Sequence, residues 1–317
     1  MQRASKVLLV GVLMAGASAW AQTYPSRPVR MINPFPPGGG TDVGARVIAQ
    51  KLSETLGQQV VVENRGGAVG NIGTASLAQA TPDGHTLGTA NNATMTINPN
   101  LYKNVGYDPV KDFSTLILVA TYPFIITARQ TLPVKSMKDL VALAKANPGK
   151  LNFASTGSYT RLIGALFKSA AGMEVTIVPY NGTGPAIIDL IGGHVDFAIA
   201  TTILPQFATG QLRPLAVTSA KRASMLADLP TVGEAGLPGL ETTAWYGLVT
   251  QVAVPKPIVK RLQTDLSRIL KMPDVRERIQ GTGADVVAGS PEEFAAIIRS
   301  EVARWGKVIK EERLPIQ

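Results

Sequence analysis

Residues 29–63 read VRMINPFPPGGGTDVGARVIAQKLSETLGQQVVVE, and this stretch predicts the fold class. The apolar run 29–32 is followed by a loop of prolines and glycines, 34–40. In residues 41–56 the apolar side chains recur at three- and four-residue spacing, which predicts a helix, and 59–63 is a second β-branched run. The order strand, helix, strand is typical of a parallel sheet with helices on its faces.

The same alternation continues through most of the chain. Further strands are expected at 86–88, 115–120, 123–127, 151–154, 175–179, 195–200, 213–217 and 245–249. Further helices are expected at 74–80, 136–146, 160–171, 184–192, 203–209, 256–271, 273–281 and 291–311. Two α/β halves in a chain of 317 residues predict two lobes around a cleft, each lobe a mainly parallel sheet flanked by helices. We expect lobe 1 to be discontinuous, 22–122 and 222–317, and lobe 2 to comprise 123–221.

The N-terminus has the pattern of a secretory signal peptide. Arg3 and Lys6 precede an apolar stretch, 7–20, and Ala-Trp-Ala at 19–21 matches an A-x-A cleavage signal. The alternative is an uncleaved membrane anchor, but the apolar stretch is shorter than the roughly 20 residues that a spanning helix needs. We therefore predict cleavage after Ala21 and export to a periplasmic space.

Composition excludes several classes of function. The chain has no cysteine, which removes disulfide scaffolds, cysteine-based metal sites and thiol nucleophiles. Its two histidines, His85 and His194, both lie in turn sequences, and neither a G-x-S-x-G motif nor a carboxylate pair is present. The formal net charge is +9, but the basic residues are scattered and aromatics are only 6%, so nucleic-acid binding is not expected. We expect no catalytic residues, no metal and no cofactor.

The best candidate site is the loop that follows the first strand. Its members are Phe35, Pro37, Gly38, Gly39, Thr41 and Asp42. Glycines allow a ligand to approach the backbone, and the free N–H groups of a helix start can bind a carboxylate or a phosphate. The alternative is a tight strand-to-helix turn capped by Thr41 or Asp42.

Three later strand ends carry similar small polar residues. The candidates there are Asn92 and Thr94 after the third strand, Ser155, Thr156, Gly157, Ser158 and Arg161 between a strand and a helix, and Thr201 after 195–200. Hydroxyl and amide groups in these loops could bind an oxygen-rich ligand, and a guanidinium could pair with an anion. The alternatives are an ordinary Asn/Thr turn and, for Arg161, a solvated helix residue.

Short motifs in a fixed order along the mature chain carry a family resemblance. They include YPSRPVR at 24–30, PFPPGGGTD at 34–42, VENRGG at 62–67, TPDGHTL at 81–87, YDPVKDF at 107–113, AKANPGK at 144–150, GGHVD at 192–196, EAGLPG at 234–239 and PEEF at 291–294. With these motifs the chain resembles the Bug family, the substrate-binding proteins of tripartite tricarboxylate transporters. The resemblance implies a periplasmic-binding-protein (Venus-flytrap) fold that closes around a small carboxylated solute without covalent chemistry.

The resemblance also implies particular contacts. It places 37–42 and 92–94 in the first lobe's half of the site, and 155–160 with Thr201 in the second lobe's half. Trp245 resembles one of an aromatic pair near the cleft, although it could instead pack against a strand.

Departures from the family pattern guide the expected ligand. Ala200-Thr201 stands where an Asp-Asn pair is common, which disfavours an amino acid, and Arg161 stands where a histidine is common and could pair with a second carboxylate. We predict an organic mono- or dicarboxylate, aromatic acids included. The resemblance implies a monomeric receptor that delivers this ligand to the permease subunits of a membrane transporter. Alternatives are a sensor component with the same fold and an exported hydrolase or isomerase.

Overall fold

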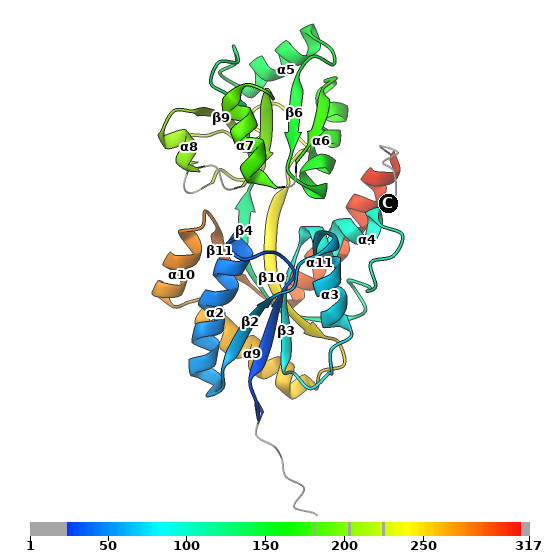
Figure 1. Ribbon diagram of the computed structural model, residues 1–317, viewed down its shortest axis with the longest axis vertical. Helices are drawn as coiled ribbons and strands as arrows, with labels where there is room; N and C mark the ends of the chain where they lie inside the picture. The colour runs from blue at the N-terminus through cyan, green and yellow to red at the C-terminus, as the bar shows by residue number, and fades with distance from the viewer. Residues whose placement is uncertain (1–23, 181, 202–203, 224–225, 312–317) are drawn as a thin grey trace, which may run out of the picture.

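The computed structural model describes residues 24–180, 182–201, 204–223 and 226–311, so the expected signal peptide lies outside the described residues. Figure 1 shows two lobes stacked along the long axis of the molecule. Lobe 1 is the lower body, built around a six-stranded sheet, and lobe 2 is the upper body, built around a five-stranded sheet.

Lobe 1 has the strand order β11-β4-β10-β3-β1-β2. The strands are β1 (Val29–Asn33), β2 (Val60–Asn64), β3 (Thr86–Asn91), β4 (Phe113–Pro123), β10 (Thr243–Gln251) and β11 (Asp285–Gly289). The helices are α2 (Gly40–Leu56), α3 (Asn71–Ala78), α9 (Lys256–Ile269), α10 (Pro273–Gln280) and α11 (Pro291–Glu311), with the short turns η1 (Ala68–Gly70), η2 (Ala93–Ile97) and α4 (Asn98–Leu101).

Lobe 2 has the strand order β7-β6-β8-β5-β9. The strands are β5 (Ile125–Arg129), β6 (Asn152–Ser155), β7 (Thr176–Pro179), β8 (Phe197–Ala200) and β9 (Leu212–Val217). The helices are α5 (Met137–Ala146), α6 (Ser158–Ala171), α7 (Thr183–Gly192) and α8 (Leu204–Ala208).

The predicted two-lobed α/β fold is confirmed, but both sheets are mixed and not mainly parallel. In lobe 1, β1 is parallel to β2 and β3, whereas β10 is antiparallel to β3 and β4. In lobe 2, β6 is parallel to β7 and β8, whereas β5 is antiparallel to β8 and β9. The antiparallel pairs arise because the chain must cross between the lobes and return, as β4 and β10 do side by side (Figure 1).

Strand register brings the important loops to facing edges. In lobe 1, Thr243 pairs with Pro123 and Tyr246 with Asn91, so the carboxyl end of β3 lies near the end of β4 that leads to lobe 2. Because β1 and β2 run parallel to β3, their following loops share this edge. In lobe 2, Ile125 at the start of β5 pairs with Ala200 at the end of β8, so the loops after β6, β7 and β8 face lobe 1.

Helix α11 belongs to both cores. Near its start, Phe294 and Ile298 pack with side chains of the lobe 1 sheet, among them Leu118. Near its end, Trp305 and Ile309 pack in the hydrophobic cluster of lobe 2. No helix within the described ranges is both long enough and apolar enough to cross a membrane.

Candidate functional site

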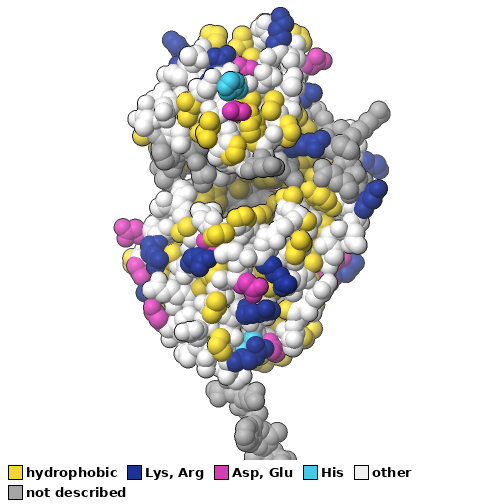
Figure 2. Space-filling model, viewed as in Figure 1, with side chains coloured by type: hydrophobic (Ala, Val, Ile, Leu, Met, Phe, Trp, Pro, Cys, Tyr) yellow, Lys and Arg dark blue, Asp and Glu magenta, His cyan; other side chains and the backbone are white. Residues whose placement is uncertain are grey.

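A hollow separates the two lobes on the face shown in Figure 2. The loops after β1 and β2 lie on its lower edge, and those after β6 and β7 lie on its upper edge. Ligands of open α/β sheets bind at such carboxyl strand ends. This cleft is therefore the candidate binding site.

The start of α2 presents unpaired backbone N–H groups to this cleft. Gly39 is the residue before the helix, with φ −75° and ψ 164°, and its carbonyl accepts the N–H of Asp42 at 2.9 Å. Among the described residues, no acceptor lies within hydrogen-bond distance of the N–H groups of Gly39, Gly40 and Thr41. A Cβ added at Gly39 would meet no atom within 4 Å. These donors lie at the positive end of the helix dipole, which is the arrangement that binds anions at helix starts.

Asp42 was predicted as a ligand contact, but its carboxylate takes part in the hydrogen bonds that hold the loop. Its buried carboxylate accepts hydrogen bonds from Arg46 Nε at 3.0 Å, Asn64 Nδ2 at 2.8 Å and the Gly38 N–H at 3.0 Å. Asn64 Nδ2 also donates to the Phe35 carbonyl at 3.0 Å. Burial alone would raise the pKa of Asp42, but these hydrogen bonds hold it below its usual range. Asp42 therefore fixes the shape of the loop.

Replacement of Asp42 by Asn is expected to lower the free energy of unfolding by about 1–3 kcal/mol at pH 7, because the amide cannot accept all three hydrogen bonds. A lowered pKa contributes stability above the unfolded value of 3.8, and this contribution is lost as pH falls through the folded pKa. The difference between wild type and variant should therefore shrink only in acid. Urea denaturation at a series of pH values measures it, with exposed Asp228→Asn as the matched control. Equal stability of the two variants at pH 7 would contradict this role.

Two glycines let α2 lie close to the sheet. A Cβ at Gly40 would overlap the hydroxyl of Tyr122, and one at Gly44 would overlap the hydroxyl of Tyr246. Both tyrosine rings are buried beneath the helix. The glycine spacing therefore sets the height of the α2 N-terminus relative to the sheet.

A strained turn after β2 also lies on this edge, and sequence reasoning missed it as a site. Ala68 (φ 44°) and Val69 (φ 55°) adopt left-handed backbone between Gly67 (φ 123°) and Gly70 (φ 92°). Asn98 Nδ2 donates to the Val69 carbonyl at 3.0 Å and supports the turn from below. Such backbone is rare for a β-branched residue, and strain of this kind gathers at functional sites. The flanking glycines were the only signal in the sequence.

The β6–α6 loop forms the corresponding structure in lobe 2. Thr160 Oγ1 accepts the N–H of Thr156 at 2.8 Å, and Ser155 Oγ donates to the Gly157 carbonyl at 3.2 Å. In the described part of the chain, the N–H groups of Tyr159 and Thr160 have no acceptor. The side chain of Ser158 lies outside the described residues. Side-chain hydroxyls thus hold the loop, and the N–H groups of Tyr159 and Thr160 remain free within the described residues.

Other predicted residues of lobe 2 lie near the same edge. Arg161 is in the first turn of α6, half-buried, and no acidic group of the described residues lies within ion-pair distance of it. Thr201 follows β8 and lines a small recess with Pro123 and Ile125. Tyr180, which was not among the predicted site residues, lies just after β7 and donates to Asp189 at 2.6 Å, and this hydrogen bond raises the pKa of Tyr180 to about 12.

Three predicted contacts do not face the cleft. The Asn92 side chain is buried, and its Oδ1 accepts the Trp245 N–H at 2.6 Å. Thr94 is buried and hydrogen-bonded to Asn91, and the Trp245 indole is buried against Phe294 at 5.2 Å between ring centres. Asn92 and Thr94 were expected at the cleft because they follow a strand, and Trp245 because of the family resemblance. The π-helical turn η2 and strand β10 direct these side chains inward.

Comparisons with known proteins agree with this architecture. Residues 44–314 match the family described as "Tripartite tricarboxylate transporter family receptor". BugT of Bordetella pertussis is 35% identical over 318 residues, which cover 98% of each chain.

Two solved structures from Rhodopseudomonas palustris are similar over nearly their full length. One, Rpa4515 with adipate, has a TM-score of 0.82 and 37% identity, covering 91% of this chain and 98% of that one. The other, MatC with bound malate, has a TM-score of 0.79 and 33% identity, covering 90% and 100%. The chain therefore belongs to the receptor family of the tripartite tricarboxylate transporters, which includes the Bug proteins and consists of periplasmic solute-binding proteins and not enzymes.

Proposed function

We propose that this protein captures a small organic carboxylate between its lobes and delivers it to the permease of a tripartite tricarboxylate transporter. The observation that carries the proposal is the pair of facing donor sets, one at the start of α2 and one at the start of α6. Relatives of the same fold that hold adipate and malate support it.

The facing donor sets explain how a ligand would drive closure. Gly39, Gly40 and Thr41 would bind one carboxylate, and the backbone of Tyr159 and Thr160 would reach the ligand from lobe 2. A ligand that touches both lobes binds the closed state more tightly than the open state, so it shifts the population toward closure. The permease would then recognise the closed form.

Arg161 favours a dicarboxylate over a monocarboxylate. The α2 donors are uncharged backbone groups, whereas Arg161 adds a full positive charge in the first turn of α6 without an acidic partner among the described residues. A guanidinium binds a carboxylate through charge-assisted hydrogen bonds, which are about twice as strong as neutral ones. We therefore assign the second carboxylate to Arg161.

The proposal includes the processing and organisation of the chain. Residues 1–21 would be removed during export, leaving Gln22 as the first residue. Lobe 1 would comprise 22–122 and 222–317, lobe 2 would comprise 123–221, and the receptor would act as a monomer.

Thermal unfolding of residues 22–317, refolded to remove host ligand, tests this function. We expect linear C4–C8 dicarboxylates, adipate and malate among them, to raise the melting temperature, because a ligand at 100 times its Kd adds about 2.7 kcal/mol. The matched diamides should give no shift, and Arg161→Gln should reduce the shift from dicarboxylates while leaving that from monocarboxylates. Equal shifts from acids and amides, or none from any acid, would contradict the proposal.

A further inference from the structure

Asn92 joins separate parts of the chain at the point where the lobes meet. Its Oδ1 accepts the backbone N–H of Trp245, and its Nδ2 lies 3.0 Å from Glu301 Oε2 and 3.3 Å from the Thr243 carbonyl. Asn92 is 3% exposed, so these bonds are made away from solvent. One side chain thus ties the end of β3 to β10 and to α11.

Glu301 is the acceptor at the centre of this arrangement. Its Oε2 accepts hydrogen bonds from Asn92 Nδ2 at 3.0 Å, Trp245 Nε1 at 3.0 Å and Thr96 Oγ1 at 3.3 Å. Burial raises the pKa of Glu301, and these hydrogen bonds and the Arg304 cation offset part of that effect. A half-buried carboxylate with three donors from two other segments fixes those segments relative to its own helix.

Tyr159 extends the arrangement into lobe 2. It belongs to the first turn of α6, whose N–H groups form the second donor set, and its hydroxyl is hydrogen-bonded to Thr242 Oγ1 and lies 3.4 Å from Asn92 Nδ2. Its ring packs edge-on against Trp305 of α11, with ring centres 5.3 Å apart. We call Asn92, Tyr159, Thr242, Trp245 and Glu301 the junction cluster.

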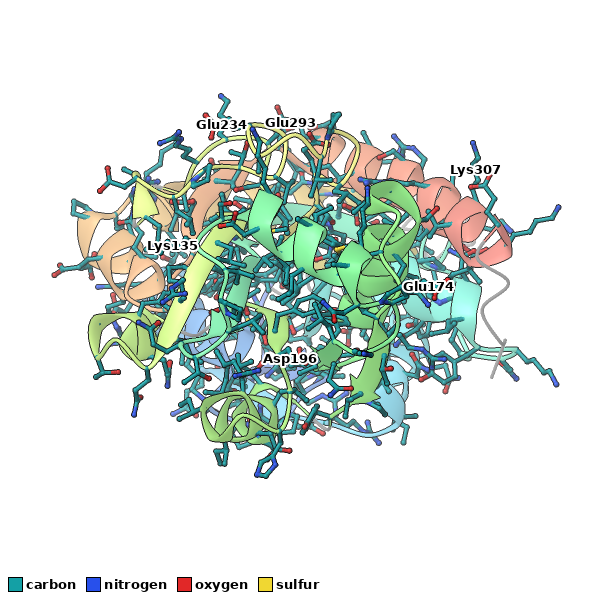
Figure 3. The ribbon with its side chains drawn as sticks, turned by 90° about the horizontal axis from the view of Figure 1, so that it is seen from above. Lys135, Glu174, Asp196, Glu234, Glu293 and Lys307 are labelled. Carbon is teal, nitrogen blue, oxygen red and sulfur yellow. The ribbon has the colours of Figure 1, made fainter. Side chains whose placement is uncertain are left out.

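Glu301 lies in the part of α11 that connects the cores of the two lobes. In Figure 3, Glu293 and Lys307 mark the two ends of this helix. Glu301 lies between Ile298, which packs in lobe 1, and Trp305, which packs in lobe 2. A contact at this point acts on the relative orientation of the two bodies.

We propose that Asn92 and Glu301 are positioning residues that hold the α6 donor set in a fixed orientation to the α2 donor set, so that both reach one ligand when the lobes close. This inference rests on the proposed function. Asn92 and Glu301 act through Tyr159 and β10, and neither touches the ligand. Without the Glu301 carboxylate, Asn92, Thr96 and Trp245 lose a shared acceptor, and the lobes sample more orientations. Apparent affinity then falls in proportion to the fraction of molecules that can close correctly.

The absence of cysteine from the chain permits a direct test by spin labelling. Cysteines replace exposed Ala208 in α8 and exposed Glu277 in α10, which lie on the same side of the molecule above and below the cleft (Figure 1). The distance distribution between the two nitroxides is measured without ligand in the wild-type background and with Glu301→Ala, Glu301→Gln or Tyr159→Phe. Tyr159→Phe keeps the ring packing and removes only the hydroxyl between the lobes. Leu266→Ala in α9 is the matched control, because Leu266 packs in a part of the lobe 1 core that includes no member of the junction cluster.

We expect Glu301→Ala and Tyr159→Phe to broaden the distribution, and Glu301→Gln and Leu266→Ala to leave its width unchanged. Adipate affinity by calorimetry should fall at least tenfold in Glu301→Ala and less than threefold in Glu301→Gln, because the amide oxygen still accepts the same bonds. A width in Glu301→Ala and Tyr159→Phe equal to that of Leu266→Ala would overturn the inference. If neither adipate nor any other acid of the panel binds the wild type, the proposed function fails, and the ligand-free distances still decide the role of the junction cluster.

Discussion

Gly39→Asp is expected to abolish carboxylate binding while leaving the protein folded. The backbone of Gly39 suits any residue, and an added Cβ meets no atom within 4 Å, so the substitution causes no steric conflict. Asp is a favoured residue before a helix, so stability should change by only a few tenths of a kcal/mol. The new carboxylate would occupy the N–H groups and repel the ligand by about 4 kcal/mol at 4 Å near a protein surface. An affinity loss of at least 100-fold is the expected result.

The variant Gly39→Asn separates the effect of the added negative charge from the effect of a side chain that fills the site. The amide has nearly the same shape and also hydrogen-bonds the helix start, but it carries no charge. We expect it to weaken binding by about tenfold or less, well short of the loss in Gly39→Asp. Calorimetric titration with the best acid of the panel measures both variants. If Gly39→Asp binds as the wild type does, the carboxylate lies elsewhere in the cleft.

The fold was predictable where local pattern and global structure agree. The 3.6-residue spacing of 41–56 and the β-branched runs beside it gave α2, β1 and β2 nearly to the residue. Strand β11 was missed, because Asp285–Gly289 is short and pairs only with β4 through a register shift between Val286 and Gly289. The mixed character of the sheets was missed because periodicity carries no information on strand direction.

The free backbone donors beside the cleft were predictable from the sequence, and the positions of the side chains were less so. Glycine-rich loops between strands and helices indicated the donor sets at the starts of α2 and α6, since helix starts must leave N–H groups free. Asn92 could not be placed correctly, because its partners Thr243 and Glu301 are 151 and 209 residues away in sequence. The conformation of Val69 was missed for the opposite reason, because left-handed backbone contradicts the local preference of a β-branched residue.

Gly44→Ala is expected to destabilise the protein even though alanine is the better helix former. In an exposed helix the change would add up to about 1 kcal/mol of stability. Here the added Cβ would overlap the Tyr246 hydroxyl and lie 2.8 Å from its Cζ, and Tyr246 is only 1% exposed and cannot turn aside. Overpacking of this kind costs about 1–3 kcal/mol, and relief requires α2 to lift from the sheet. Because the donor set lies at the start of α2, adipate affinity should fall as well.

The Tyr246 hydroxyl provides an internal control for this clash. It is buried and has no hydrogen-bond partner in the described structure, so Tyr246→Phe should by itself stabilise the protein by about 1 kcal/mol. The phenylalanine also removes the atom that the new Cβ would overlap, so the double variant should be more stable than the sum of the single effects predicts, by about 1–2 kcal/mol. Gly184→Ala in α7, where an added Cβ meets no atom within 4 Å, should be neutral or stabilising. Urea unfolding of the four variants measures the coupling, and strict additivity would show that the height of α2 is set by something other than this contact.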